Sequence, residues 1–373
     1  MFLYSSFIIE LTNEITKAAK RLMPFKVSAD SAMNFFISFS IYLIPIIFSY
    51  LLTRYSISAF LSNKSNNAKF SQPISKFIEA HNKKNVPIFG GVFMLISLLI
   101  STLLIIIMKN LLHTFCPSFF IIFRKLTIFS MQSLFPVCLA VSFAAIGFID
   151  DLQKVKYRKN SAMSAKTKFL LQIITASICV ILFRKVNPLS NLSYIDKIST
   201  TSSSDLNFLS LAWQVFVIVG TANAVNLTDG IDGLAGNVSK ICIILLGFIS
   251  NKNAYLCFCM VSIINAFLRF NNNPAKIFMG DTGSLLLGSF MSGVALESGV
   301  EWTFAISGGV FIMETLSVIL QIASVKLFKK RIFPITPIHH YFEKHYTEKE
   351  IVYYAKKITL FLSFIALMIS LLN

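Results

Sequence analysis

The hydrophobic residues of this chain lie in long, nearly unbroken runs that short polar segments separate. A soluble protein of this length would show alternating polar and apolar faces, whereas runs of about 18 or more apolar residues with few charges are typical of membrane-spanning helices. The pattern predicts an all-α, polytopic integral membrane protein with about ten transmembrane helices. The expected spans are 33–53, 87–108, 126–149, 167–184, 207–222, 237–250, 254–270, 282–297, 302–326 and 354–372.

The first 32 residues differ from the rest because acidic and basic side chains interrupt their apolar positions. They end in no small-residue cleavage pattern, so a cleavable signal peptide is not expected. An amphipathic helix lying in the membrane interface fits this composition. We therefore expect an N-terminal interfacial segment at 1–32 and a single transmembrane domain at 33–373.

The charge distribution predicts an orientation. The chain has a net charge of +17, and about two thirds of its 34 Lys and Arg lie in alternate connections. The positive-inside rule makes these connections cytoplasmic and places both termini outside. Basic residues beside apolar spans favour anionic lipid head groups, so no nucleic acid partner is expected. The basic connections are 54–86, 150–168, 222–240, 269–281 and 326–357.

Acidic residues are rare, and a group of them falls on this cytoplasmic side. Removing a carboxylate from water costs several kcal/mol unless a partner compensates, so acids at the edge of apolar spans indicate a site. Three different connections contribute, and a fourth on the same side adds two adjacent histidines. The sequence therefore predicts a polar active site at the cytoplasmic face. The residues are Asp150, Asp151, Asp229, Asp232, Asp281, His339 and His340.

Each motif has a simpler alternative. Asp150 and Lys154 are four residues apart and would share a helix face, as an ordinary ion pair at a helix end would. Asp229 and Asp232 would share a helix face too, or would lie in a loop whose glycines let the backbone approach a phosphate, and the simpler alternative is a polar turn between spans. Asp281, between two glycines, suits a hard cation but also a helix cap.

Two further features stay open between a site and a structural role. His339 and His340 suit phosphate or metal binding, or are a pair of surface histidines. Glu314 is the acid expected inside a span, where a functional group or an interhelical hydrogen bond would explain it. The oxygen-rich residues suit Mg²⁺ better than Zn²⁺, and a basic membrane surface with Mg²⁺ indicates a phosphorylated lipid or a nucleotide as substrate.

These segments together resemble the bacterial phospho-N-acetylmuramoyl-pentapeptide-transferases, within the wider polyprenyl-phosphate N-acetylhexosamine-1-phosphate transferases. The similarity runs from about residue 33 to the C-terminus. Asp150-Asp-x-x-Lys154 and Asn226-Leu-Thr-Asp-Gly-x-Asp-Gly233 match the wider superfamily. The segments that resemble the peptidoglycan branch are Glu314–Gln321, Arg331–Phe333 and Pro337-Ile-His-His340 with Phe342-Glu343.

The resemblance implies an enzyme that transfers phospho-N-acetylmuramoyl-pentapeptide from UDP-MurNAc-pentapeptide to undecaprenyl phosphate, giving lipid I and UMP with Mg²⁺. This is the first membrane step of peptidoglycan synthesis, hence of cell wall biogenesis and cell division, and it takes place at the bacterial inner membrane. The resemblance leaves a homodimer open. Two other interpretations remain: a transferase that uses UDP-GlcNAc or a related sugar, and, more remotely, a polytopic transporter.

The resemblance also implies roles for individual residues. Asp281 is the expected direct Mg²⁺ ligand, with Asp229 as a second metal residue. Asp150 and Asp151 would lie by the lipid phosphate, Asp150 as base or orienting group. The expected catalytic residues are Asp150, Asp151, Asp281, His339 and His340, and the expected substrate-binding residues are Lys84, Lys154, Lys168, Asn226, Asp229, Asp232, Asn271, Phe278 and Gln321.

Within that set, Lys154 and Lys168 would offset phosphate charge, and Lys84, Asn271 and Phe278 resemble a uracil pocket. The chain departs from the family pattern at two places. Tyr341 replaces a third histidine, and Asn85-Val-Pro-Ile-Phe-Gly-Gly91 lacks the threonine hydroxyls of the corresponding family segment.

Overall fold

The computed structural model describes residues 29–63, 69–71, 86–115, 131–158, 163–186, 204–250 and 252–372. Over these residues the regular elements are helices, with one isolated bridge between Ser71 and Pro87. Most of the predicted interfacial segment and the side chain of Lys84 lie outside the described residues. The all-α prediction is confirmed for the described part of the chain.

Eight of the described helices are long and apolar enough to cross a membrane, so the prediction of a polytopic membrane protein is confirmed. Each of the ten predicted spans overlaps a described helix, although for two of the spans that helix is not among these eight. The eight are α2 (Ala29–Ser62), α5 (Gly90–Phe115), α7 (Phe135–Tyr157), α8 (Ala165–Val186), α10 (Ser204–Thr228), α12 (Ala254–Asn271), α15 (Gly309–Phe328) and α17 (Glu348–Leu372).

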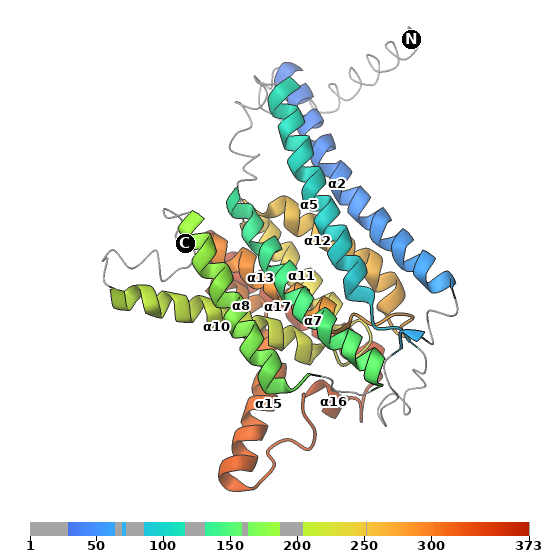
Figure 1. The fold of residues 1–373 in the computed structure, drawn as a ribbon, viewed down its shortest axis with the longest axis vertical. Helices are drawn as coiled ribbons and strands as arrows, with labels where there is room; N and C mark the ends of the chain where they lie inside the picture. The colour runs from blue at the N-terminus through green and yellow to red at the C-terminus, as the bar shows by residue number, and fades with distance from the viewer. Residues whose placement is uncertain are drawn as a thin grey trace.

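The two remaining predicted spans correspond to helices that fall short of the length or the hydropathy of the other eight. Helix α11 (Leu234–Ile249) is apolar but has only 16 residues, fewer than the usual length of about 20. Helix α13 (Gly280–Ser298) is rich in glycine and serine, and it lies in the middle of the bundle against α5, α7, α10 and α11 (Figure 1). Because α13 is covered by protein, it does not need an apolar surface facing lipid.

Small residues let the neighbouring helices approach α13 closely. A Cβ added at Gly288 would lie 2.6 Å from the Cα of Ala222 on α10, which is closer than real Cβ contacts. A Cβ added at Gly147 would lie 2.3 Å from the carbonyl oxygen of Asp281. Close backbone packing through small residues is typical of membrane helix interfaces. It brings the end of α7 directly against the start of α13.

The predicted span 302–326 is not one continuous helix. It consists of α14 (Glu301–Ser307) and α15, which meet at Gly308, and glycine has a low helix propensity. Beyond this break α15 projects from the bundle and is followed by the segment that carries α16 (His339–Phe342) (Figure 1). This path returns the chain toward the ends of α7 and α10.

Several helices extend beyond the predicted spans, and two of these extensions reach polar motifs. Helix α7 continues to Tyr157 and α10 continues to Thr228, so Asp150, Asp151 and Asn226 are helical residues. Their side chains are therefore held on rigid elements. The short 3-10 helix η1 (Met131–Leu134) leads into α7, whose first turn contains a proline, as the first turn of a helix tolerates.

Candidate functional site

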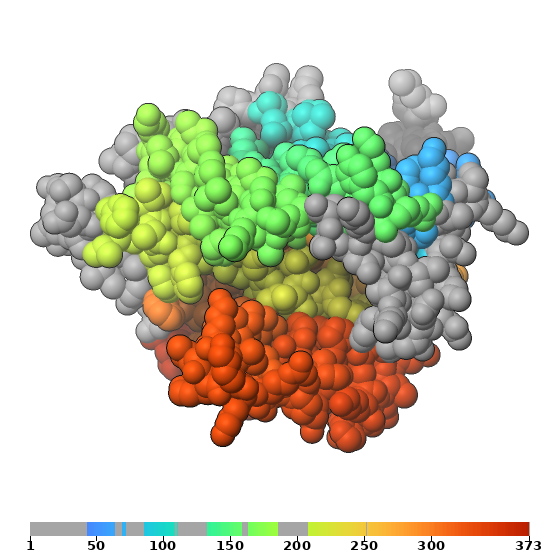
Figure 2. Space-filling model, turned by 60° about the horizontal axis from the view of Figure 1, so that its bottom comes forward, coloured from blue at the N-terminus to red at the C-terminus, as the bar shows by residue number. Residues whose placement is uncertain are grey.

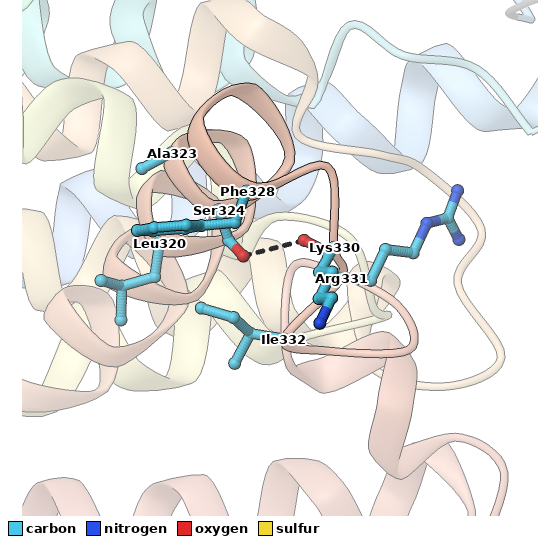
Figure 3. A pocket seen from close by; sticks show the side chains of 7 residues that line it. All are labelled: Leu320, Ala323, Ser324, Phe328, Lys330, Arg331 and Ile332. Carbon is cyan, nitrogen blue, oxygen red and sulfur yellow. Dashed lines mark hydrogen bonds between the residues drawn. The ribbon is translucent and has the colours of Figure 1, made fainter.

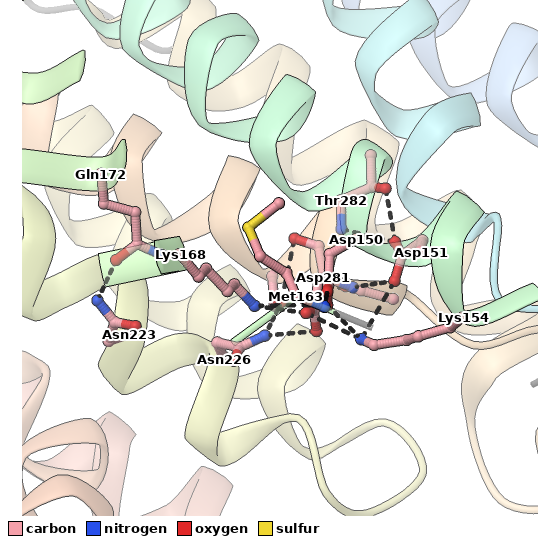
Figure 4. A network of polar contacts seen from close by, with 12 residues as sticks. Asp150, Asp151, Lys154, Met163, Lys168, Gln172, Asn223, Asn226, Asp281 and Thr282 are labelled. Atoms are coloured by element: carbon pink, nitrogen blue, oxygen red, sulfur yellow. Dashed lines mark hydrogen bonds and ion pairs between the residues drawn. The ribbon is translucent and has the colours of Figure 1, made fainter. Parts of the chain in front are cut away.

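Four helix ends meet in one network of polar side chains (Figure 4). Helix α7 and helix α13 contribute the acids, α8 contributes a lysine and α10 contributes an asparagine. Hydrogen-bonded partners in the network are up to 131 positions apart in the sequence, so tertiary packing assembles it. Its members are Asp150, Asp151, Lys154, Lys168, Asn226, Asp281 and Thr282.

Lys154 lies at the centre of three carboxylates. Its Nζ is 2.9 Å from Oδ2 of Asp150, 3.6 Å from Oδ1 of Asp151 and 2.9 Å from Oδ2 of Asp281. Asp150 is only 3% exposed and Asp151 is fully buried, so this is not an ordinary ion pair at a solvated helix end. Charges taken out of water need close partners of opposite sign, and Lys154 provides one to all three acids.

Asp281 is the acid with the most cationic surroundings. Its Oδ2 also accepts from Nζ of Lys168, and its Oδ1 accepts from Nδ2 of Asn226 at 2.9 Å. Burial opposes ionisation of this carboxyl, but the charges of Lys168 and Lys154 outweigh it and hold the pKa of Asp281 below its usual range. Asp281 is therefore ionised at neutral pH, as a ligand for a hard cation must be.

Asp151 caps the start of α13. Its Oδ1 accepts from the backbone N–H of Asp281 at 3.0 Å, and its Oδ2 accepts from the N–H and the hydroxyl of Thr282 at 2.9 and 2.6 Å. The first N–H groups of a helix have no partner within the helix, and a carboxylate there also interacts favourably with the helix dipole. Asp151 thus fixes the backbone that carries Asp281.

The acids Asp229 and Asp232 lie in the turn between α10 and α11, which decides between the helix and the loop alternatives. Oδ2 of Asp232 accepts from the backbone N–H of Ala275 at 2.9 Å and ties this turn to the α12–α13 connection. Burial, together with the charges of Asp281 and Asp151, raises the pKa of Asp229 well above its usual range. Among the causes of this shift, only the charge of Lys154 acts in the opposite direction and favours the ionised carboxylate.

The histidine pair on α16 lies against the same turn. Nδ1 of His339 is 3.0 Å from Oε2 of Glu314, and Nδ1 of His340 is 2.7 Å from Oε2 of Glu343. A Cβ added at Gly230 would lie 2.3 Å from Nε2 of His339. A glycine is required for this close approach, and the two histidines are not a pair of freely solvated surface residues.

Asn271 is the last residue of α12, and Phe278 lies in the connection between α12 and α13. Oδ1 of Asn271 accepts from the N–H of Gly233 at 3.1 Å, and its Nδ2 donates to the carbonyl of Ile277 at 2.9 Å. The backbone N–H of Phe278 donates to the carbonyl of Pro87 at 2.8 Å. The amide of Asn271 thus joins two connections, whereas the ring of Phe278 is only partly buried. Their roles in a uracil pocket stay predictions.

Gln321 lies away from the network, near the end of α15. Its Oε1 accepts from the backbone N–H groups of Ile332 and Phe333 at 3.1 and 2.9 Å, and the hydroxyl of Ser324 donates to the carbonyl of Lys330. These bonds fold the basic segment after α15 back onto the helix, beside a groove of about 610 Å³ (Figure 3). In the structure the side chain of Gln321 therefore holds the backbone of Ile332 and Phe333, and its role in substrate binding stays a prediction.

Sequence reasoning missed two hydroxyl residues at the start of α13 as members of the site. Thr282 donates to Asp151, and Oγ of Ser284 accepts from Nδ2 of Asn226 at 2.8 Å. Their only signal in the sequence is their place within the Gly280–Ser284 motif. Sequence reasoning also missed the pairing of each histidine with a glutamate. Glu343 lies in the same motif as His340, whereas nothing in the sequence spacing pairs Glu314 with His339.

The carboxylates of this site suit a Mg²⁺ ion that is held partly by the protein and partly by substrate phosphates. In the described part of the chain no group of three or more Asp, Glu, His or Cys is placed so that it could hold a metal ion by itself. Mg²⁺ usually keeps several waters and takes one or two carboxylates, which Asp281 and Asp229 can supply. Burial and the nearby charges of Asp281 and Asp151 both raise the pKa of Asp229, and a divalent cation bound beside it would favour its ionised form.

The surface around these residues has contributions from distant parts of the chain. Figure 2 shows the yellow-green surface of the α10–α11 region set between the green segments of α7 and α8 and the orange-red segments that follow α14. The end of α10 contacts the acid–lysine network through Asn226, and the α10–α11 turn contacts α16 through Gly230 and His339, so a substrate at this turn would lie near both.

Comparison with known proteins identifies the family. Residues 133–299 match the model of the family described as Glycosyl transferase family 4. The phospho-N-acetylmuramoyl-pentapeptide-transferase of Prochlorococcus marinus is 34% identical over 354 residues, which are 91% of this chain and 92% of that protein. The chain belongs to the phospho-N-acetylmuramoyl-pentapeptide-transferase family.

Other members of this transferase family agree. The protein of Staphylococcus carnosus is 38% identical over 74% of this chain and 82% of its own length, and that of Rickettsia prowazekii is 36% identical over 76% and 80%. The matched segment 133–299 includes α7, α8, α10 and α13, which carry the acid–lysine network. Family membership confirms the resemblance and favours the transferase over the transporter.

Proposed function

We propose that this protein transfers phospho-N-acetylmuramoyl-pentapeptide from UDP-MurNAc-pentapeptide to undecaprenyl phosphate, releasing UMP and forming lipid I. The observation that carries the proposal is the buried network of three carboxylates and two lysines at the ends of membrane helices, in a chain of this family. An oxygen of the lipid phosphate attacks the phosphorus next to the sugar, and the bond from that phosphorus to UMP breaks.

Charge explains why such a network suits this reaction. Both substrates are anions and repel each other, so phosphoryl transfer depends on neutralising and positioning them. Lys154 and Lys168 pair with Asp281 and Asp150 within the protein, and a bound phosphate offers the same ammonium groups a second anionic partner. We assign the two lysines to the phosphates and Asn226, Asp229 and Asp232 to the nucleotide-sugar side.

The metal and the acids complete the proposal. Asp281 and Asp229 would hold Mg²⁺, which supplies charge neutralisation for the transferred phosphate when it is bound. Asp150 orients the lipid phosphate, whose oxygens are mostly ionised near pH 7, so little proton abstraction is required. Asp151 serves the reaction through the backbone of α13. The protein would act in the bacterial inner membrane, and a homodimer is compatible with this function.

The test is release of UMP by the purified protein in detergent with Mg²⁺ and both substrates. Wild type should release UMP with UDP-MurNAc-pentapeptide and not with UDP-GlcNAc, and chelation of Mg²⁺ should stop release reversibly. Asp281→Asn should abolish turnover while the protein still folds, as a single cooperative melting transition would show. The proposal would be contradicted if the protein released UMP from UDP-GlcNAc but not from UDP-MurNAc-pentapeptide, or if Asp281→Asn turned over as fast as wild type.

A further inference from the structure

A buried pair of ionisable residues lies outside the acid–lysine network. Glu314 on α15 is 4% exposed and His339 on α16 is 1% exposed. Oε2 of Glu314 accepts the backbone N–H of His339 at 3.3 Å and faces its ring Nδ1 at 3.0 Å. A single carboxylate oxygen therefore fixes both the backbone and the ring of this histidine.

This geometry determines the tautomer of His339. A carboxylate only accepts hydrogen bonds, so Nδ1 carries the proton and, in the neutral ring, Nε2 does not. Nε2 is buried and has no hydrogen-bond partner among the described residues. It faces Gly230, where an added Cβ would lie 2.3 Å away. The ring thus spans the distance between α15 and the turn that contains Asp229 and Asp232.

His340 packs on this ring. The centroids of the two imidazoles are 4.1 Å apart and their planes are inclined by 67°. Its Nδ1 lies 2.7 Å from Oε2 of Glu343, and its side chain is 20% exposed, so it is the more accessible histidine. Any displacement of the His339 ring would therefore move both the α10–α11 turn and His340.

We propose that Glu314 is a positioning residue that acts through His339, holding the Asp229–Gly233 turn and the His340 ring in the arrangement that the transfer reaction needs. The inference rests on the proposed function. It gives His339 and His340 different roles: His339 is a fixed support between two elements, and His340 is the imidazole that faces the substrate side.

Glu297 provides a matched control for simple loss of a buried hydrogen bond. It is 8% exposed, it accepts from Nδ2 of Asn253 at 2.8 Å, and it lies at the opposite end of α13 from Asp281. Glu297→Ala and Glu314→Ala each remove one buried carboxylate and leave its donors unpaired. Only Glu314→Ala should also release the His339 ring.

The experiment compares wild type with Glu314→Ala, Glu314→Gln and Glu297→Ala in detergent. We measure melting temperature, kcat and KM for UMP release, and ¹⁵N spectra of labelled histidine with the His339 signal assigned from His339→Gln. Glu314→Ala should lower kcat about 10- to 100-fold, as small displacements of reacting groups do, and should lose the Nδ1-protonated signal. Glu314→Gln, whose amide oxygen also accepts, should retain the signal and most of the turnover.

The proposal is overturned if Glu314→Ala keeps wild-type kcat, or if Glu297→Ala loses as much turnover for the same fall in melting temperature. Absence of UMP release by wild type would instead reject the proposed function. In that case the ring spectra still decide the inference: an unchanged His339 signal in Glu314→Ala overturns it, and a lost signal that Glu314→Gln restores supports it.

Discussion

Asp151 offers a test that separates a structural carboxylate from its neighbour in the sequence. Asp151→Asn should destabilise the protein and lower turnover, whereas Asp150→Asn should lower turnover with little loss of stability. Asp151 receives three hydrogen bonds from the first residues of α13. Asp150 receives one backbone N–H, from Met163 at 3.0 Å, and pairs with Lys154 at 2.9 Å.

The magnitude follows from these contacts. An Asn oxygen in the place of Oδ2 keeps both bonds from Thr282, but its NH₂ then faces the N–H of Asp281. Losing a hydrogen bond to a charged acceptor costs about 1.5–3 kcal/mol, and losing the charge at the helix start costs about 0.3–1 kcal/mol. Relief of repulsion between Asp151 and Asp281 offsets part of this, so the net loss should be about 1–3 kcal/mol.

Asp150→Asn keeps its bond from Met163, leaves Lys154 paired with Asp281 and removes one of three close like charges. Its cost should therefore stay below about 1 kcal/mol. The assay is fluorescence-detected melting in one detergent, with UMP release measured at a temperature well below both midpoints. Asp151→Asn should melt at a lower temperature than wild type and Asp150→Asn at nearly the same temperature. Equal midpoints for Asp151→Asn and wild type, or a lower midpoint for Asp150→Asn, would refute the capping argument.

Two further predictions use matched pairs of variants. Lys168→Ala removes a cation that pairs with Asp281 and should lower the rate of UMP release about 100-fold or more. Lys166 is exposed on the same helix, and Lys166→Ala should leave the rate unchanged. Equal rates for the two variants would exclude the phosphate role of Lys168. Gly288→Ala places a Cβ 2.6 Å from a backbone atom of α10 and should cost about 1–3 kcal/mol in melting experiments. Gly220→Ala meets nothing within 4 Å and should not lower stability; similar midpoints for both would show that α13 does not pack this closely.

The sequence predicted the location of most membrane helices, and it singled out several polar residues that the structure brings together in one network. The shared face of Asp150 and Lys154 follows from their spacing, and the structure bears it out. The break at Gly308 was missed because one glycine in an apolar run does not reveal which of its neighbours will bend. The burial of α13 was missed because its Gly and Ser residues lower its hydropathy, although they are what allows the helix into the centre of the bundle.

Site residues were easier to identify than to interpret. Motif and spacing select Asp151 and Asn271 as polar residues near the site, but their hydrogen bonds to Thr282 and Gly233 depend on which backbone lies opposite. Glu314 was recognisable as an unusual acid within a span. Its interaction with His339, 25 residues away, required the path of the chain beyond α15.

The sequence by itself determined that this protein is a bundle of membrane helices with acids and histidines at helix ends. The physical reason is that a lipid environment requires long apolar helices with satisfied backbone groups, and this requirement is visible in composition alone. Only the tertiary structure decided which acid holds the α13 backbone, which one faces the two lysines and which histidine is fixed by a buried carboxylate. Those assignments depend on contacts between helices far apart in the chain, which residue spacing does not specify.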